Sequence, residues 1–228
     1  MESSFPKRSC SNKEMRSSSH LGSSVKACTM KPVINACVFA VLFTGSIDNS
    51  NAQTFGSSYT STAPKDCRVV GKPGESGGTT QVCPGKSGLV VLITEDDLRE
   101  TVSVGRDRAA AAKEPAAEAW FAPFNSTEPT VEWRTANGKP FAIIQRWHIA
   151  DGSDPDKDGR PNTKAMLTVT RLPPGAVCHV AYVDAKANPD ANQLARKAAD
   201  ESARDFQCGK DQVKIVGQSG RAVELVRR

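Results

Sequence analysis

An Asp-rich segment between two β-like runs is the sharpest chemical motif in the sequence. Carboxylates alternate at Asp154, Asp156 and Asp158 and are followed by Gly159, as at the start of a loop that surrounds Ca²⁺ with oxygen ligands. The twelfth position of an EF-hand loop requires a bidentate Glu, but Ala165 occupies it here. Two interpretations stay open: a calcium site of another type, with Ca²⁺ as the one candidate cofactor, and a solvated turn.

Two histidines, His148 and His179, are the candidate acid–base residues. Neither belongs to a His pair at metal-ligand spacing, and the chain has no Gly-x-Ser-x-Gly nucleophile motif. One interpretation is a small hydrolase in which either histidine acts with loop carboxylates. The other is that both are ordinary strand residues, because an isolated histidine carries little mechanism by itself.

Three tryptophans are the candidate ligand-binding aromatic residues. Trp133 and Trp147, with His148 beside the second, could line a groove, because aromatic rings with a few polar groups are typical of binding sites. Trp120 belongs to the same aromatic set. In a chain with only 6% aromatic residues, these rings could equally anchor the core.

An apolar run over residues 33–45 indicates an export signal at residues 30–52. The run is shorter than the roughly 20 residues that span a bilayer, and Lys31 precedes it. Small residues at Ser50 and Ala52 suit signal peptidase, which predicts cleavage before Gln53. The alternatives are an uncleaved anchor or a buried helix.

Residues 1–29 form an upstream extension, rich in Ser and basic residues, that is longer than an ordinary signal-peptide start. Translation from Met30 is the simplest explanation, so that this extension would not be part of the protein. An organellar transit peptide is the alternative, since such peptides are also Ser-rich and poor in acidic residues.

Removal of residues 1–52 changes the charge and the cysteine count. The whole chain has a net charge of +5 and seven cysteines; the remainder has 24 basic and 22 acidic residues, a net of +2. That balance argues against a nucleic-acid partner. Four cysteines remain, and an even number in an exported chain predicts two disulfides. These are Cys67, Cys83, Cys178 and Cys208.

The positions of the four cysteines predict their pairing. Cys67 and Cys83 flank a hairpin whose turn-rich loop is 73–78, so they lie opposite each other. Cys178 begins a strand, and a helix over 189–207 returns the chain by a similar length to Cys208. The predicted bonds are therefore 67–83 and 178–208.

The remaining pattern predicts a single disulfide-stabilised α+β domain over 65–228, after a flexible leader at 53–64. Its fold is a mainly antiparallel β-sheet with one long amphipathic helix, 189–207, packed on it. Asn137-Gly138 gives a strong hairpin signal, and Thr94–Asp97 resembles a capping signal for one helical turn. The strand-like runs are 67–72, 79–83, 88–93, 101–104, 130–135, 140–149, 164–170, 176–183, 212–216 and 222–226.

Residues 59–217 as a whole resemble uncharacterised exported proteins of Gram-negative bacteria. The stretches that carry the resemblance are 98–105 (LRETVSVG), 171–184 (RLPPGAVCHVAYVD) and 188–196 (NPDANQLAR). The resemblance implies a periplasmic address, and no activity or catalytic residue is carried over with it.

The sequence therefore predicts a periplasmic or secreted protein with a non-enzymatic role in binding or protein contact. Its partner would be an unknown protein or small ligand, with no membrane span once the signal is cleaved. The alternatives are the hydrolase that uses His148 or His179, and an inhibitor of a secreted enzyme that inserts a rigid loop such as 73–78. An exposed aromatic patch would favour the binding protein, and a histidine in a concave pocket would favour the enzyme.

Overall fold

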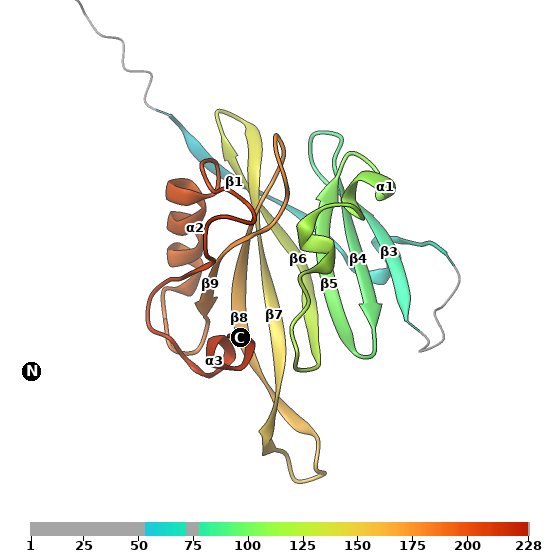
Figure 1. Ribbon diagram of the computed structural model, residues 1–228, viewed down its shortest axis with the longest axis vertical. Helices are drawn as coiled ribbons and strands as arrows, with labels where there is room; N and C mark the ends of the chain where they lie inside the picture. The colour runs from blue at the N-terminus through green and yellow to red at the C-terminus, as the bar shows by residue number, and fades with distance from the viewer. Residues whose placement is uncertain (1–52, 72–77, 228) are drawn as a thin grey trace, which may run out of the picture. The chain divides into compact units, whose positions relative to one another are not determined.

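Two β-sheets and the helix α2 make up most of the described chain (Figure 1). The computed structural model describes residues 53–71 and 78–227, which fall within one compact unit, Ser50–Arg228. The predictions for the upstream extension and the signal at 1–52, and most of the loop at 73–78, lie outside these residues. Among the described residues, no helix is long and apolar enough to span a membrane.

The larger sheet has six strands in the order β1-β6-β7-β8-β9-β10, antiparallel except for the β9–β10 pair. The smaller sheet has four strands in the order β2-β3-β4-β5 and is antiparallel throughout. The strand bounds are β1 Phe55–Ser61, β2 Arg68–Val69, β3 Thr79–Pro84, β4 Val90–Asp96, β5 Arg99–Gly105, β6 Asn125–Ala136, β7 Lys139–Pro155, β8 Pro161–Arg171, β9 His179–Asp184 and β10 Lys214–Ile215.

Five short helical elements complete the described part of the chain. The longest is α2. The Ala-rich sequence over 107–119 favours helix, with an interruption expected at Pro115, and the stretch is indeed divided there into α1 and η2. The helical bounds are η1 Pro64–Asp66, α1 Arg108–Ala111, η2 Pro115–Glu118, α2 Ala191–Ser202 and α3 Arg221–Val226. The α+β fold class with a mainly antiparallel sheet is thus confirmed.

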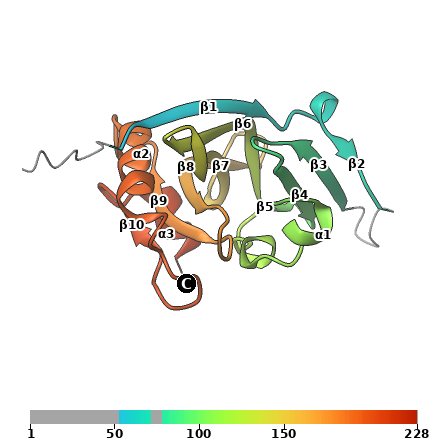
Figure 2. The ribbon, with the colours of Figure 1, turned by 90° about the horizontal axis from the view of Figure 1, so that it is seen from above.

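Helix α2 lies on one side of the six-stranded sheet and the smaller sheet lies on the other (Figure 2), and each face of the six-stranded sheet carries a hydrophobic core. Alternation along β7 places Ile143 and Trp147 in the core shared with the smaller sheet and α3, while Ile144 faces the core under α2. The small face of α2, with alanines such as Ala195, packs closely on that second core. The central strands are therefore buried on both sides.

The segment predicted as a flexible leader, 53–64, is instead ordered as an edge strand. Strand β1 pairs antiparallel with β6 over its whole length, from Phe55 opposite Ala136 to Ser61 opposite Thr130. The Ser/Thr-rich sequence hides this because its alternation is weak, whereas the long β6 offers an unpaired edge. The prediction of a flexible leader was wrong for this reason.

Two further local predictions were wrong near the C-terminus. Residues 222–226 form helix α3 and not a strand, and they bury Ala222, Val223 and Val226 in the core between the sheets. Asn188, which precedes the predicted helix 189–207 and is a residue type that favours N-caps, does not cap it: its side chain donates to the carbonyls of Asp184 and Gln218. Helix α2 therefore begins at Ala191, and its 12 residues end earlier than expected.

Both predicted disulfides are confirmed. Cys67 bonds to Cys83 across the β2–β3 hairpin, with a sequence separation of 16, and Cys178 bonds to Cys208 beyond α2, with a separation of 30. In the chain-entropy model, loops of this size stabilise the fold by about 3 and about 4 kcal/mol. Two disulfides fit an oxidising compartment.

Candidate binding site

The turn between β4 and β5 presents a large apolar side chain to solvent. Asp96 pairs with Arg99, so Asp97 and Leu98 alone form the loop, and their φ angles are 49° and 60°. Positive φ at both central residues is the type I′ hairpin geometry, so the expected helical turn at 94–97 is wrong. The Leu98 side chain is 62% exposed.

Two exposed aromatic rings lie in the segment that follows η2. Trp120 is 49% exposed and Phe124 is 42% exposed. The backbone N–H of Asn125 donates to the carbonyl of Leu98 at 2.9 Å, which joins this segment to the β4–β5 turn. Residues more than twenty positions apart in sequence therefore form one surface.

Arg99 holds this surface together. Its guanidinium carbon lies 4.6 Å from the ring centroid of Phe124 and 5.7 Å from that of Trp120, within cation–π range. Its Nε donates to the carbonyl of Ala122 at 2.8 Å, and Nη1 pairs with the carboxylate of Asp97. We call Leu98, Arg99, Trp120 and Phe124 the Arg99 site.

Two hollows adjoin at Arg99. The larger, of about 610 Å³, has Trp120 in its wall, and the smaller, of about 260 Å³, has Phe124. The larger is lined by Thr94, Asp96, Asp97, Arg99, Thr101, Ala117, Trp120 and Ala122. The smaller is lined by Arg99, Pro123, Phe124, Ala150, Gly152 and Pro161. Together they have the size and the mixed lining of a ligand site.

The β4 and β5 strands supply negative charge around the Arg99 site. Glu95 and Asp96 end β4, Asp97 lies in the turn, and Glu95 lies directly opposite Glu100 in the hairpin. Burial, with a smaller contribution from Glu95, raises the pKa of the Glu100 carboxyl above its usual value, although the Thr127 N–H donates to it at 2.7 Å.

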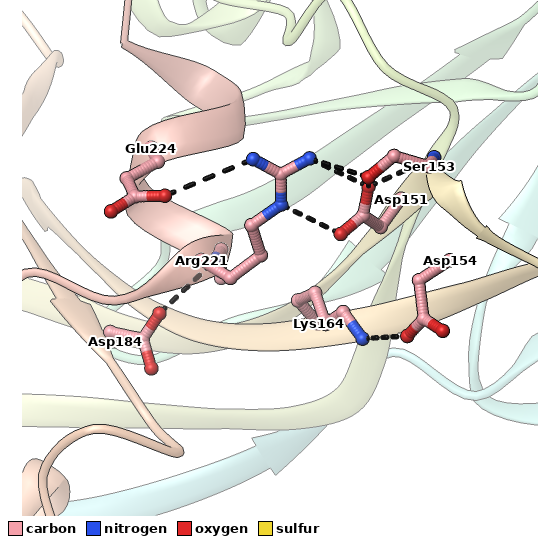
Figure 3. Close-up of polar contacts among 8 residues, drawn as sticks. Asp151, Ser153, Asp154, Lys164, Asp184, Arg221 and Glu224 are labelled. Atoms are coloured by element: carbon pink, nitrogen blue, oxygen red, sulfur yellow. Dashed lines mark hydrogen bonds and ion pairs between the residues drawn. The ribbon is translucent and has the colours of Figure 1, made fainter.

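The far wall of the smaller hollow is the base of the β7–β8 hairpin, whose tip extends past the neighbouring strand ends (Figure 1). Figure 3 shows how that base is held. Arg221 of α3 donates to both carboxylate oxygens of Asp151, at 2.7 and 2.9 Å, and to the Ser153 hydroxyl at 2.9 Å. These bonds from Arg221 and Ser153 hold the pKa of Asp151 well below its usual range.

The structure does not gather the three predicted calcium ligands. The Asp154 carboxylate pairs with Lys164, and Asp156 accepts the backbone N–H groups of Asp158 and Arg160, both at 2.9 Å. Those bonds belong to a hairpin turn, as in the solvated-turn interpretation. In the described part of the chain, no group of three His, Cys, Asp or Glu side chains is arranged to hold a metal ion.

Trp133 and Trp147, predicted as possible groove residues, are both completely buried. The indole N–H of Trp133 donates to the Thr60 hydroxyl at 2.8 Å, and that of Trp147 to Thr168 at 2.9 Å. Their polar atoms are thus satisfied inside the core. The groove interpretation was wrong for these two rings, which are core side chains.

The two histidines have different surroundings. The Nε2 of His148 lies 3.1 Å from a carboxylate oxygen of Glu128. The same oxygen forms an ion pair with Nε of Arg146 at 3.8 Å. His179 is 4% exposed; its Nδ1 lies 2.9 Å from the Tyr182 hydroxyl, and its Nε2 has no hydrogen-bond partner among the described residues. Burial lowers the pKa of His179 to about 4.

Sequence reasoning missed Leu98, Arg99 and Phe124 as site residues. The available signal was that Asp97-Leu98 stands between two β-like runs, where an Asp-Gly pair is expected. Comparison of the chain with protein-family models, with curated proteins and with solved structures finds no match. The site is therefore interpreted from its geometry alone.

Proposed function

We propose that this chain is exported to the periplasm, or secreted, and acts there as a non-enzymatic binding protein through the Arg99 site. The partner is a protein or a small ligand. The observation that carries the proposal is the exposure of Trp120 and Phe124, each within cation–π distance of Arg99, beside a hollow of about 610 Å³. The two disulfides support the oxidising compartment.

The residue types at the Arg99 site favour binding. Trp and Arg are enriched among the residues that dominate interface energies, and exposed apolar patches rimmed by polar groups mark contact surfaces. The bond between Asn125 and Leu98 and the bond from Arg99 to Ala122 fix the two segments before a partner arrives. Such preorganisation lowers the entropic cost of association.

The hydrolase alternative has weaker support in the geometry. His179 is almost inaccessible to a substrate, and its pKa near 4 makes it a weak base at neutral pH. His148 is half-exposed and beside Glu128, but it lies on a strand and carries no neighbouring nucleophile motif.

A second candidate function is inhibition of a secreted enzyme, and the β7–β8 hairpin is the observation that favours it. This hairpin projects, and Arg221 braces its base at Asp151 and Ser153. In this proposal the β7–β8 hairpin, and not the loop at 73–78, is the segment that inserts into the target enzyme. Incubation with serine, cysteine and metallo-proteases tests the idea; full residual activity in every case would refute it.

Intrinsic fluorescence gives a direct test of binding at the Arg99 site. Of the three tryptophans, Trp133 and Trp147 are completely buried, so a ligand at this surface changes mainly the emission of Trp120. We expect at least one class of probe (short peptides, oligosaccharides or amphiphiles) to shift that emission with a saturable dose response.

Phe124→Ala should weaken that response about tenfold or more, because the ring is part of the surface. Tyr59→Ala is the matched control, since Tyr59 is an aromatic residue of similar exposure, 52%, on β1. Equal responses in the original protein and the Phe124→Ala variant would contradict the proposal.

A further inference from the structure

Among the described residues, the β4–β5 and β6–β7 hairpin turns share positive φ at both central positions but carry different residues there. In the β6–β7 turn, Asn137 and Gly138 have φ angles of 50° and 78°. In the β4–β5 turn, Asp97 and Leu98 have φ angles of 49° and 60°. Leucine thus occupies the position where the other turn has glycine, although a positive φ is strained for a bulky side chain.

The packing of the fold does not explain this leucine. Its side chain is 62% exposed, and its backbone N–H and carbonyl are both used in the turn, with Glu95 and Asn125. A glycine would satisfy the same two hydrogen bonds without strain. Strained residues that the fold does not require are concentrated at functional sites.

The charge around Leu98 limits the kind of partner. Glu95, Asp96 and Asp97 adjoin it, and Arg99, the nearby cation, already pairs with Asp97 and lies over the two aromatic rings. An acidic partner would meet like charge at the turn, whereas a basic one would meet complementary charge. The rings of Trp120 and Phe124 also attract cations.

We propose, building on the proposed function of the Arg99 site, that its partner is a protein segment that is both apolar and positively charged, with Leu98 as the anchor residue. Leu98 contacts the apolar side chains of the partner segment. The Lys or Arg side chains of that segment face Glu95, Asp96 and Asp97. The same surface thereby discriminates against acidic proteins, because like charges across an interface oppose association.

The test uses three short peptides with the same leucine content that carry Lys, Glu or Ser at the remaining positions. Binding to the full chain is followed through Trp120 emission. We expect the Lys peptide to bind at least about tenfold more tightly than the Glu peptide, and to weaken as salt is raised from about 0.05 to about 0.3 M.

Leu98→Gly should weaken binding of the Lys peptide about tenfold or more without lowering the melting temperature, because glycine suits the turn. Tyr59→Ala again serves as the control and should bind as the original protein does. Equal affinity for the Lys and Glu peptides, or unchanged affinity in Leu98→Gly, would overturn the proposal.

The outcomes separate this inference from the proposed function. If Phe124→Ala weakens binding of every peptide while charge and Leu98→Gly have no effect, the Arg99 site binds ligands but the inferred partner class is wrong. If no peptide changes Trp120 emission, the basic apolar partner is refuted, and the broader probe panel then decides the proposed function.

Discussion

At the scale of single residues, the backbone strain at Leu98 leads to a prediction about Leu98→Gly. This substitution should weaken binding of the partner and at the same time make the folded protein more stable. Leu98→Gly removes a left-handed leucine, which costs about 1–2 kcal/mol, although glycine also loses more backbone entropy on folding. We expect a net increase in the free energy of unfolding of about 0.5–1 kcal/mol, measured by denaturant titration.

Gly138→Leu is the matched control for that substitution. A Cβ atom at Gly138 would meet nothing within 4 Å, so only backbone strain would oppose it at φ 78°. We expect a loss of about 1 kcal/mol or more. If Leu98→Gly destabilised the protein as much as Gly138→Leu does, then the leucine would be part of the fold's own packing.

His179 predicts a loss of stability in mild acid. The folded state lowers the pKa of its imidazole from 6.5 to about 4 by burial, so the unfolded chain takes up a proton first as the pH falls. The stability that the neutral, buried imidazole contributes is fully present above pH 6.5. As the pH falls towards 4, the free energy of unfolding decreases by about 3 kcal/mol.

Denaturant titration across that pH range measures the effect of His179. The variant His179→Phe should show a flatter dependence on pH, because phenylalanine fills the site without titrating. Val69→Ala, at an exposed residue that does not titrate, is the control and should leave the slope as it is. If the free energy of unfolding depends on pH as steeply in the His179→Phe variant as in the original protein, the prediction is contradicted.

At the scale of elements, the brace between α3 and the β7–β8 hairpin is the feature most open to test. Asp151 is only 2% exposed, and its carboxylate pairs with the Arg221 guanidinium. Arg221→Ala removes that partner and leaves a buried carboxylate without its cation. We expect a lower melting temperature and faster hydrogen exchange in residues 151–162. The measurements are calorimetry and exchange followed by mass spectrometry.

Lys197→Ala is the comparison for the Arg221 brace. Lys197 pairs with Glu201 at 3.9 Å on an exposed face of α2, with both side chains more than 60% exposed, and such pairs contribute little. We expect no change in melting temperature or in exchange. Equal effects of Arg221→Ala and Lys197→Ala would mean that Arg221 does not brace the hairpin.

At the scale of the whole molecule, export predicts a chain that starts at Gln53 and has no free thiol. Cleavage after Ala52 removes Cys10, Cys28 and Cys37, and the four other cysteines are paired. Iodoacetamide should therefore modify no cysteine of the denatured periplasmic protein before reduction and four cysteines after it. A product that starts before Gln53, or that is alkylated without reduction, would refute the prediction.

The sequence by itself determined the features that depend on local pattern. The Asn137-Gly138 hairpin, the interruption at Pro115 and the two disulfides follow from turn chemistry, ring geometry and element lengths, all of which act over short stretches of chain. The α+β class follows for the same reason.

Tertiary structure alone decided the rest. Strand β1 forms because β6 offers it an edge to pair with. Residues 222–226 are helical because a helix there buries Ala222, Val223 and Val226 in the core between the sheets. Trp133 and Trp147 are buried whereas Trp120 is exposed, although all three are the same residue type. Exposure depends on which distant segments cover a side chain, and for that reason the Arg99 site became visible only in the folded molecule.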